Sequence, residues 1–329
     1  EIHSGDWSSD VCSSDLRFKK VTVPGGQTTE AVDYTADHHV AEVQRSSTSG
    51  GVTTDESYLY DYAEGSDGEE RIQSITLRRR VDQGAWENVE RVLYTYYTGA
   101  SGDSFGSLGD LKTATHQHLD DSAWVADAVH YYRYWTSGQS NGFVHGLKYV
   151  VNPAAYAALA ADPAVADPLT ASDAQVAQYA DHYFEYNSDY RVTRERVEGG
   201  ALETTLTYVD GTHANGYNHW KRKTTETRDD GSQTIVYTNY MGQILLRERV
   251  TSDGSAIEFN EYDDDSRLLV KATPSAIDSY VDDAGAGGNE LSVTWRSEAE
   301  SYTVGLAYLN EYYAATDLEE GAVAGYLAY

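Results

Sequence analysis

Hydrophobic and polar residues alternate along most of this chain, in short runs that end at turn-forming residues. The clearest example is residues 237–276. There, three apolar residues lie two or four positions apart and therefore share one face of an extended strand: Ile244, Leu246 and Val250. The pair Asp253-Gly254 favours left-handed turn positions and predicts a hairpin. A second strand through residue 262, a turn at 263–266 and a third strand from 267 complete the pattern.

The same succession of aromatic strand, turn and second strand recurs elsewhere in the chain. It predicts further hairpins over residues 58–77, 91–113, 130–150, 183–197 and 220–240, with more strands at 291–295 and 302–308. The fold class expected is mainly β, built from consecutive antiparallel β-hairpins. Residues 58–152 and 184–329 form two hairpin regions, and residues 17–57, where alternation is weak, form an irregular β/loop lead-in.

Residues 153–183 interrupt the β pattern. The Ala-rich stretch 153–161 favours a helix, and Pro153 suits its first turn. Apolar residues at helical spacing follow a run of capping hydroxyl and carboxyl groups at 170–173. We therefore predict a short helical insert, too small to form a domain of its own.

Residues 1–16 have the character of an artefact. Residues 6–16 read DWSSDVCSSDL, the translation of one frame of a common sequencing-library adapter, so we expect this segment not to be native. The chain's only cysteine, Cys12, lies in it, which leaves the rest without a thiol for catalysis, metal binding or a disulfide. We also expect the chain to be truncated at both ends.

Charge and composition narrow the functional classes. Without residues 1–16 the acidic count falls from 53 to 49 against 24 basic residues, a net charge of −25. Such a balance argues against nucleic acid or anionic membranes as partners. No apolar run is long enough for a membrane span. The 28 tyrosines against 5 phenylalanines are typical of half-buried strand positions, where the ring is covered and the hydroxyl stays wet.

The tyrosine, turn and Arg-Leu order in YDDDSRLLV, residues 262–270, resembles the tyrosine–aspartate (YD) repeat of Rhs-type proteins. The resemblance covers scattered units in 58–149 and 183–277. The family pattern has Gly before the Arg, whereas this chain has Ser266 and Tyr190 there, and Gly242 precedes Gln243. The residues matched to the motif are Tyr186, Arg191, Val192, Tyr240, Gly242, Tyr262, Asp263, Arg267 and Leu268.

In the bacterial proteins that the chain resembles, such hairpins wind into a spiral shell or curved sheet. The resemblance implies a secreted or cell-surface, non-enzymatic structural segment that encloses or presents another domain, as in toxin encapsulation. The alternative is a carbohydrate-binding or adhesion module that recognises a surface glycan, with or without calcium. Toxin-carrying relatives cleave themselves at Asp-Pro-x-Gly. Neither Asp162-Pro163 nor Asp167-Pro168 continues that way, so neither self-cleavage nor toxicity is expected here.

Three acidic or histidine-rich segments are candidates for metals. His116 and His118 would share one strand face, as in some zinc sites, but no third ligand is identifiable. Residues 263–265 and 282–283, the latter near 289–290, carry oxygen ligands for calcium without the spacing of a calcium loop. Neither a nucleophile elbow nor a phosphate loop nor a dinucleotide fingerprint is present. We predict no catalytic residue, no metal ligand and no cofactor.

Overall fold

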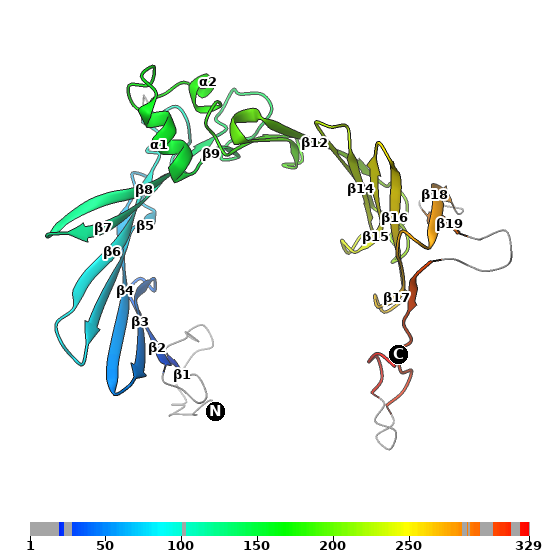
Figure 1. Ribbon diagram of the computed structural model, residues 1–329, viewed down its shortest axis with the longest axis horizontal. Helices are drawn as coiled ribbons and strands as arrows, with labels where there is room; N and C mark the ends of the chain where they lie inside the picture. The colour runs from blue at the N-terminus through cyan, green and yellow to red at the C-terminus, as the bar shows by residue number, and fades with distance from the viewer. Residues whose placement is uncertain are drawn as a thin grey trace. The chain divides into compact units, whose positions relative to one another are not determined.

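The computed structural model of the protein describes residues 20–22, 28–100, 103–284, 288, 290–296, 305–316 and 323–328. Within these residues the chain is mainly β, with two α-helices (Figure 1). It divides into two compact units. The first runs up to Tyr190 and includes Val197–Gly200, and the second holds Arg191–Arg196 and the chain from Ala201 on.

The first unit is a meander in which each strand is antiparallel to the next, as predicted. Its strands are β1 (Lys20–Thr22), β2 (Thr28–Tyr34), β3 (Val40–Ser49), β4 (Val52–Glu64), β5 (Glu70–Val81), β6 (Glu87–Tyr96), β7 (Leu111–Asp120), β8 (Ala123–Tyr134), β9 (Leu147–Val151) and β10 (His182–Tyr186).

The predicted helical insert is confirmed between β9 and β10. It contains α1 (Pro153–Ala161) and the one-turn α2 (Asp173–Val176), and a 3-10 turn (Glu198–Gly200) lies further along the chain. Figure 1 shows both helices beside β8 and β9. Their apolar residues form the core of this unit with the two strands: Tyr131, Tyr149, Val151, Leu159, Val165, Ala171, Val176 and Ala180.

The second unit repeats the antiparallel meander from β12 to β17 and continues it with β20. Its strands are β11 (Val192–Val197), β12 (Leu202–Asp210), β13 (Arg222–Arg228), β14 (Gln233–Thr238), β15 (Ile244–Thr251), β16 (Gly254–Tyr262), β17 (Leu268–Ala272) and β20 (Ala307–Leu309). The hairpin of β18 (Ile277–Ala284) and β19 (Glu290–Trp295) is a separate two-stranded sheet.

This extra hairpin covers one face of the second unit's sheet. Tyr237, Leu246 and Ile257 from the sheet are almost fully buried together with Ala272, Ala276 and Ile277. Partly buried side chains from β18 and β19 pack against that cluster: Tyr280, Leu291 and Val293. The core of this unit therefore lies between the sheet and the β18–β19 hairpin.

The segment expected to be an irregular lead-in is more regular than its sequence indicated. It contains β2, β3 and the beginning of β4, all paired in the meander. Apolar alternation is weak there because polar contacts join these strands to their neighbours. The Ser57 hydroxyl bonds the Glu42 carboxylate, and Arg78 donates to the same carboxylate at 2.7 Å. Residues 1–16, the expected adapter translation, lie outside the described residues.

Two turn predictions need correction. The β15–β16 loop is Ser252-Asp253, since Gly254 already pairs with Thr251, and of the expected left-handed pair only Gly254 has a positive φ, +132°. The Gly-rich sequence of residues 282–288 predicts a surface loop, but residues 282–284 belong to β18. The Asp282 carboxylate accepts hydrogen bonds from Tyr237 Oη at 2.6 Å and Lys223 Nζ at 2.9 Å. Those bonds hold the strand end against the sheet.

Candidate functional site: tyrosine-capped hairpin turns

One five-residue turn recurs between strands in both units. The N–H of its fourth residue donates to the C=O of its first, and this fourth residue has a positive φ. These turns begin at Thr35, Gly65, Asn187, Arg228, Asn239 and Asp263. The left-handed fourth residues are His38 (+76°), Gly68 (+79°), Tyr190 (+63°), Gly231 (+78°), Gly242 (+81°) and Ser266 (+68°). Ser266 and Tyr190, which stand where the YD pattern has glycine, thus occupy the left-handed fourth position of the turn, where glycine is favoured.

The first residue of the turn organises it through its side chain. Asp263 Oδ1 accepts from the backbone N–H groups of Asp265 at 3.0 Å and Arg267 at 2.8 Å. Asn239 Oδ1 accepts in the same way from residues 241 and 243, both at 3.0 Å. Such Asx turns satisfy backbone donors that a tight turn would otherwise leave unpaired. This explains why an Asp or Asn follows the strand in these units.

A tyrosine hydroxyl closes the strand pair beside each of several turns. In the described residues, six tyrosines donate to the C=O of a residue at or near the start of an adjacent strand. The pairs are Tyr62 to Val40 (2.9 Å), Tyr96 to Ile72 (2.8 Å), Tyr186 to Leu147 (2.9 Å), Tyr208 to Val192 (2.6 Å), Tyr262 to Ile244 (3.1 Å) and Tyr312 to Leu268 (2.9 Å). We call these six residues the cap tyrosines. Each joins the strand that follows one turn to the chain segment that leads into the next turn.

In four of the six pairs, the residue just before the accepting carbonyl stacks on the same tyrosine. The guanidinium of Arg267 lies 4.7 Å from the centroid of the Tyr312 ring, and that of Arg191 lies 5.4 Å from the Tyr208 ring. Arg71 lies 5.9 Å from the Tyr96 ring, and the His39 ring is 4.9 Å from that of Tyr62. An Arg-Leu or Arg-Val pair therefore binds one tyrosine twice, through cation–π stacking and through its carbonyl.

Electrostatics fix the arginine in place. Arg267 Nε bonds Asp263 Oδ2 at 2.7 Å, and its Nη2 lies 2.9 Å from Asp265 Oδ2. Partial burial would raise the pKa of Asp263, but hydrogen bonds from Arg267 and Asp265 outweigh it and hold the pKa below its ordinary value. Burial raises the pKa of the Tyr262 hydroxyl, which keeps it a donor.

The structure brings most of the motif residues together but separates one. Tyr186 and Tyr262 are cap tyrosines, Val192 and Leu268 supply accepting carbonyls, and Arg191 and Arg267 stack. Tyr240, which the sequence matched to the motif together with Tyr262, lies at a turn tip instead. It is 39% exposed, and its ring is 5.6 Å from that of Tyr217. The position equivalent to Tyr262 before that turn is Thr238.

The sequence pattern assigned tyrosine and arginine to one repeat, whereas in space the arginine contacts the tyrosine of the next. A fixed spacing could not have revealed this, because the separation of cap and acceptor ranges from 16 residues at Tyr208 to 44 at Tyr312. The signal that could have found it is the recurrence of Arg followed by Ile, Val or Leu after a turn, at Arg71, Arg191 and Arg267.

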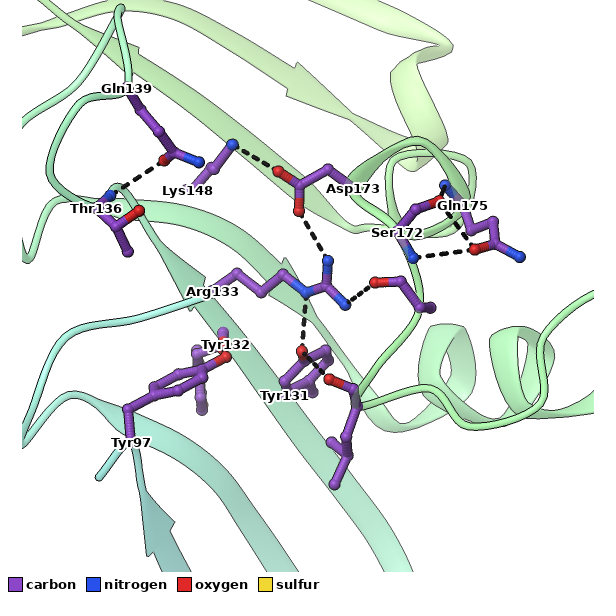
Figure 2. A network of polar contacts seen from close by, with 12 residues as sticks. Tyr97, Tyr131, Tyr132, Arg133, Thr136, Gln139, Lys148, Ser172, Asp173 and Gln175 are labelled. Atoms are coloured by element: carbon purple, nitrogen blue, oxygen red, sulfur yellow. Dashed lines mark hydrogen bonds and ion pairs between the residues drawn. The ribbon is translucent and has the colours of Figure 1, made fainter. Parts of the chain in front are cut away.

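A second polar network binds the helical insert to the first unit's sheet (Figure 2). Arg133 of β8 is fully buried. Its Nε donates to Tyr131 Oη at 2.8 Å, its Nη1 to Asp173 Oδ1 at 2.7 Å and its Nη2 to a carbonyl of the insert. Lys148 of β9 donates to Asp173 Oδ2 at 2.6 Å. One carboxylate at the first residue of α2 thus pairs two cations.

Asp173 is held ionised by these partners. Burial would raise the pKa of the Asp173 carboxyl, but the hydrogen bonds and charges of Lys148 and Arg133 lower it below its ordinary value of 3.8. The N-cap Ser172 and Gln175 form a capping box around the same turn. Every strong donor of Arg133 has a partner, so the network favours a structural role.

The candidate zinc segment forms a cluster of histidine–carboxylate contacts instead. A β-bulge opposite His116 and Gln117 inserts Asp127 between the two histidines. His118 Nδ1 lies 2.5 Å and His116 Nδ1 3.1 Å from the Asp127 carboxylate, and His116 Nε2 lies 3.1 Å from Glu90. Both ring nitrogens of His116 therefore face carboxylates.

Several of the calcium candidates are engaged in other contacts. Asp263 and Asp265 bond Arg267, Asp282 bonds Tyr237 and Lys223, and residue 289 lies outside the described residues. Over the described ranges, no group of three or more His, Cys, Asp or Glu is arranged to hold a metal ion. None of the helices that the structure describes is long and apolar enough to cross a membrane.

Comparison with known protein families finds no family model that matches the chain. Comparison with curated proteins likewise finds no match.

Proposed function

We propose that the chain is a non-enzymatic structural segment of a YD-repeat wall, of the Rhs type, that encloses or presents another domain. The observation that carries this proposal is the set of cap tyrosines, which bond neighbouring parts of the antiparallel meander to each other in both units. A run of hairpins whose strands are also joined by side-chain bonds suits a wall, because a single hairpin is only marginally stable. Such a wall would be secreted or displayed at the cell surface.

The polar clusters of the chain support a structural role in the same way. Arg133, Asp173 and Lys148 are paired with one another, and the turn carboxylates bond arginines or backbone N–H groups. A catalytic centre, in contrast to these paired groups, usually keeps a reactive group facing a cavity.

Enclosure is tested by limited proteolysis of the protein made from the complete open reading frame that contains this sequence. The proposal predicts that the neighbouring domain is cut at least about tenfold more slowly in the whole protein than alone, because cleavage needs an opened state. Equal cutting rates in the two forms would overturn it. A variant with a protease site in the Gly50-Gly51 turn, which is exposed, controls for general resistance.

The second candidate is glycan binding, which one observation in the first unit favours. A cavity of about 360 Å³ lies beside the turn between β4 and β5 and is lined by Arg71, Gln73, Tyr94, Tyr96 and Leu108. Tyrosine rings next to amide and guanidinium groups suit a saccharide, which offers apolar faces and hydroxyls. A glycan array with wild-type protein and Gln73→Ala tests it. Binding that the substitution abolishes would support adhesion, and an absence of binding would reject it.

A further inference from the structure

The second unit contains a cavity that plays no part in the cap-tyrosine contacts described above. It has a volume of about 420 Å³ and lies where the β18–β19 hairpin crosses the end of β16. This size is within the range of small-molecule sites. Its lining includes Leu245, Phe259, Glu261, Glu290, Leu291 and Trp295.

One wall of the cavity is aromatic. Phe259 packs against the core of the unit, which fixes its ring, and Trp295 at the end of β19 is 41% exposed. A large aromatic ring left open beside a cavity offers a π face to a ligand.

The side-chain amide and imidazole nitrogens in the lining already have partners. Asn218 Nδ2 donates to the C=O of Tyr262 at 2.7 Å, and Asn218 Oδ1 accepts from the Tyr262 N–H at 2.8 Å. Asn260 Nδ2 donates to the C=O of Ile244 at 2.9 Å. His219 Nδ1 lies 3.4 Å from the C=O of Ala214, and its Nε2 lies 3.3 Å from Glu290 Oε1. What remains for a ligand is chiefly acceptors.

The acceptor best placed is Glu261. It stands two residues after Phe259 on β16, on the strand face that the hairpin covers. It is only partly exposed. Among the described residues its carboxylate has neither an ion pair nor a hydrogen bond. Ser292 adds a hydroxyl that can accept as well as donate.

We propose that this cavity binds an organic cation, a guanidinium or ammonium group, with Glu261 as its counter-ion and Trp295 as its aromatic partner. A guanidinium has five N–H donors and no acceptor, which complements a lining whose unpartnered carboxylate, that of Glu261, is an acceptor. Cation–π stacking on tryptophan is the strongest of its kind. The net charge of −29 also draws cations toward the protein. The proposal does not depend on the wall function.

Calorimetric titration with Nα-acetyl-arginine amide tests the site, with the neutral isostere Nα-acetyl-citrulline amide as the matched ligand. The arginine compound binds saturably at one site, and the citrulline compound binds at least about tenfold more weakly, because only the former pairs with Glu261 and stacks as a cation. Equal binding of the two ligands, or no binding of the arginine compound, would overturn the proposal.

Two variants locate the site. Glu261→Gln keeps the side-chain shape and weakens arginine-amide binding at least about tenfold. Glu258→Gln, on the same strand but 3.6 Å from Arg247, leaves binding unchanged. Unchanged binding in Glu261→Gln would reject the site. If that variant does not fold, the comparison of the two ligands on the unaltered protein decides the matter.

A capped Gly-Gly-Arg-Gly-Gly peptide distinguishes the two sources of such a cation. Tighter binding than the amide indicates a protein side chain, and weaker binding indicates a free small molecule.

Discussion

At the scale of the residue, two features recur through the fold: the cap tyrosine and the left-handed turn position. Tyrosine places a donor at the wet end of an apolar ring, and this chain has 28 tyrosines against 5 phenylalanines. Four of the cap tyrosines use both parts, since the ring stacks under Arg or His while the hydroxyl bonds a strand-opening carbonyl. The turn position needs a positive φ, which only glycine adopts without strain.

Removing the glycine from one turn and introducing a glycine at the next should change the free energy of unfolding in opposite directions. Gly242→Ala places a Cβ at φ +81° with open space around it, so backbone strain alone costs about 1 kcal/mol. Ser266→Gly removes strain at φ +68° and raises the free energy of unfolding by about 0.5 kcal/mol, net of a hydroxyl contact to Gln243. Urea unfolding measures both. A loss of stability in Ser266→Gly would contradict the explanation of the turn.

The cap hydroxyl is tested by Tyr208→Phe. The substitution keeps the ring under Arg191 but removes the 2.6 Å bond to the C=O of Val192, and should cost about 1 kcal/mol. Tyr308→Phe in the same unit is the control, because Tyr308 is 50% exposed and should change stability by less than about 0.5 kcal/mol. Equal stability of the two variants would show that the cap hydroxyl bonds do not stabilise the fold.

At the scale of the element, alternation in the sequence was enough to predict the hairpins, and the Ala-rich stretch that begins at Pro153 was enough to predict the helical insert. Strands β15, β16 and β17 fall where residues 237–276 indicated them, and α1 begins at Pro153. The cap pairing could not be predicted, because loops of different length separate each tyrosine from its acceptor. The regular strands before residue 57 were missed because polar pairs such as Glu42 with Arg78 replace apolar alternation. The bonds that Asp282 accepts from Tyr237 and Lys223 were not predicted, because the Gly-rich sequence that follows Asp282 is typical of a surface loop.

The insert should depend on one carboxylate. Asp173→Asn leaves Arg133 and Lys148 buried with an uncharged partner and should cost about 3–5 kcal/mol. The control is Asp37→Asn, an exposed turn residue of the same unit, with an expected change below about 0.5 kcal/mol. Urea unfolding followed by near-ultraviolet circular dichroism reports both. Similar midpoints for the two variants would show that the network contributes nothing.

The same carboxylate makes the first unit sensitive to acid. The pKa of Asp173 is lowered in the folded protein, so the folded state holds its proton less tightly than the unfolded chain does. Its stabilising effect is complete above the ordinary value of 3.8 and is lost as the pH falls through the folded pKa. The difference in unfolding free energy between wild type and Asp173→Asn should therefore shrink from pH 7 to pH 3. A difference that stays constant over this range would contradict the assignment.

At the scale of the whole molecule, hairpin succession, strongly negative charge and tyrosine-rich strand ends agree with a wall built from repeats. The two units contain the same device, each with three cap tyrosines among its described residues. Repeats that contact mainly their neighbours can be added in any number, which suits a structure whose size must match its contents.

The most direct measurement is an electron cryo-microscopy reconstruction of the protein produced from the complete open reading frame, recovered from adapter-free genomic reads. The account predicts a hollow particle whose wall contains this hairpin succession and whose interior holds density for another domain. A particle without an interior space, or one whose remaining domains all lie on the outer surface of these hairpins, would contradict enclosure and leave adhesion as the better explanation.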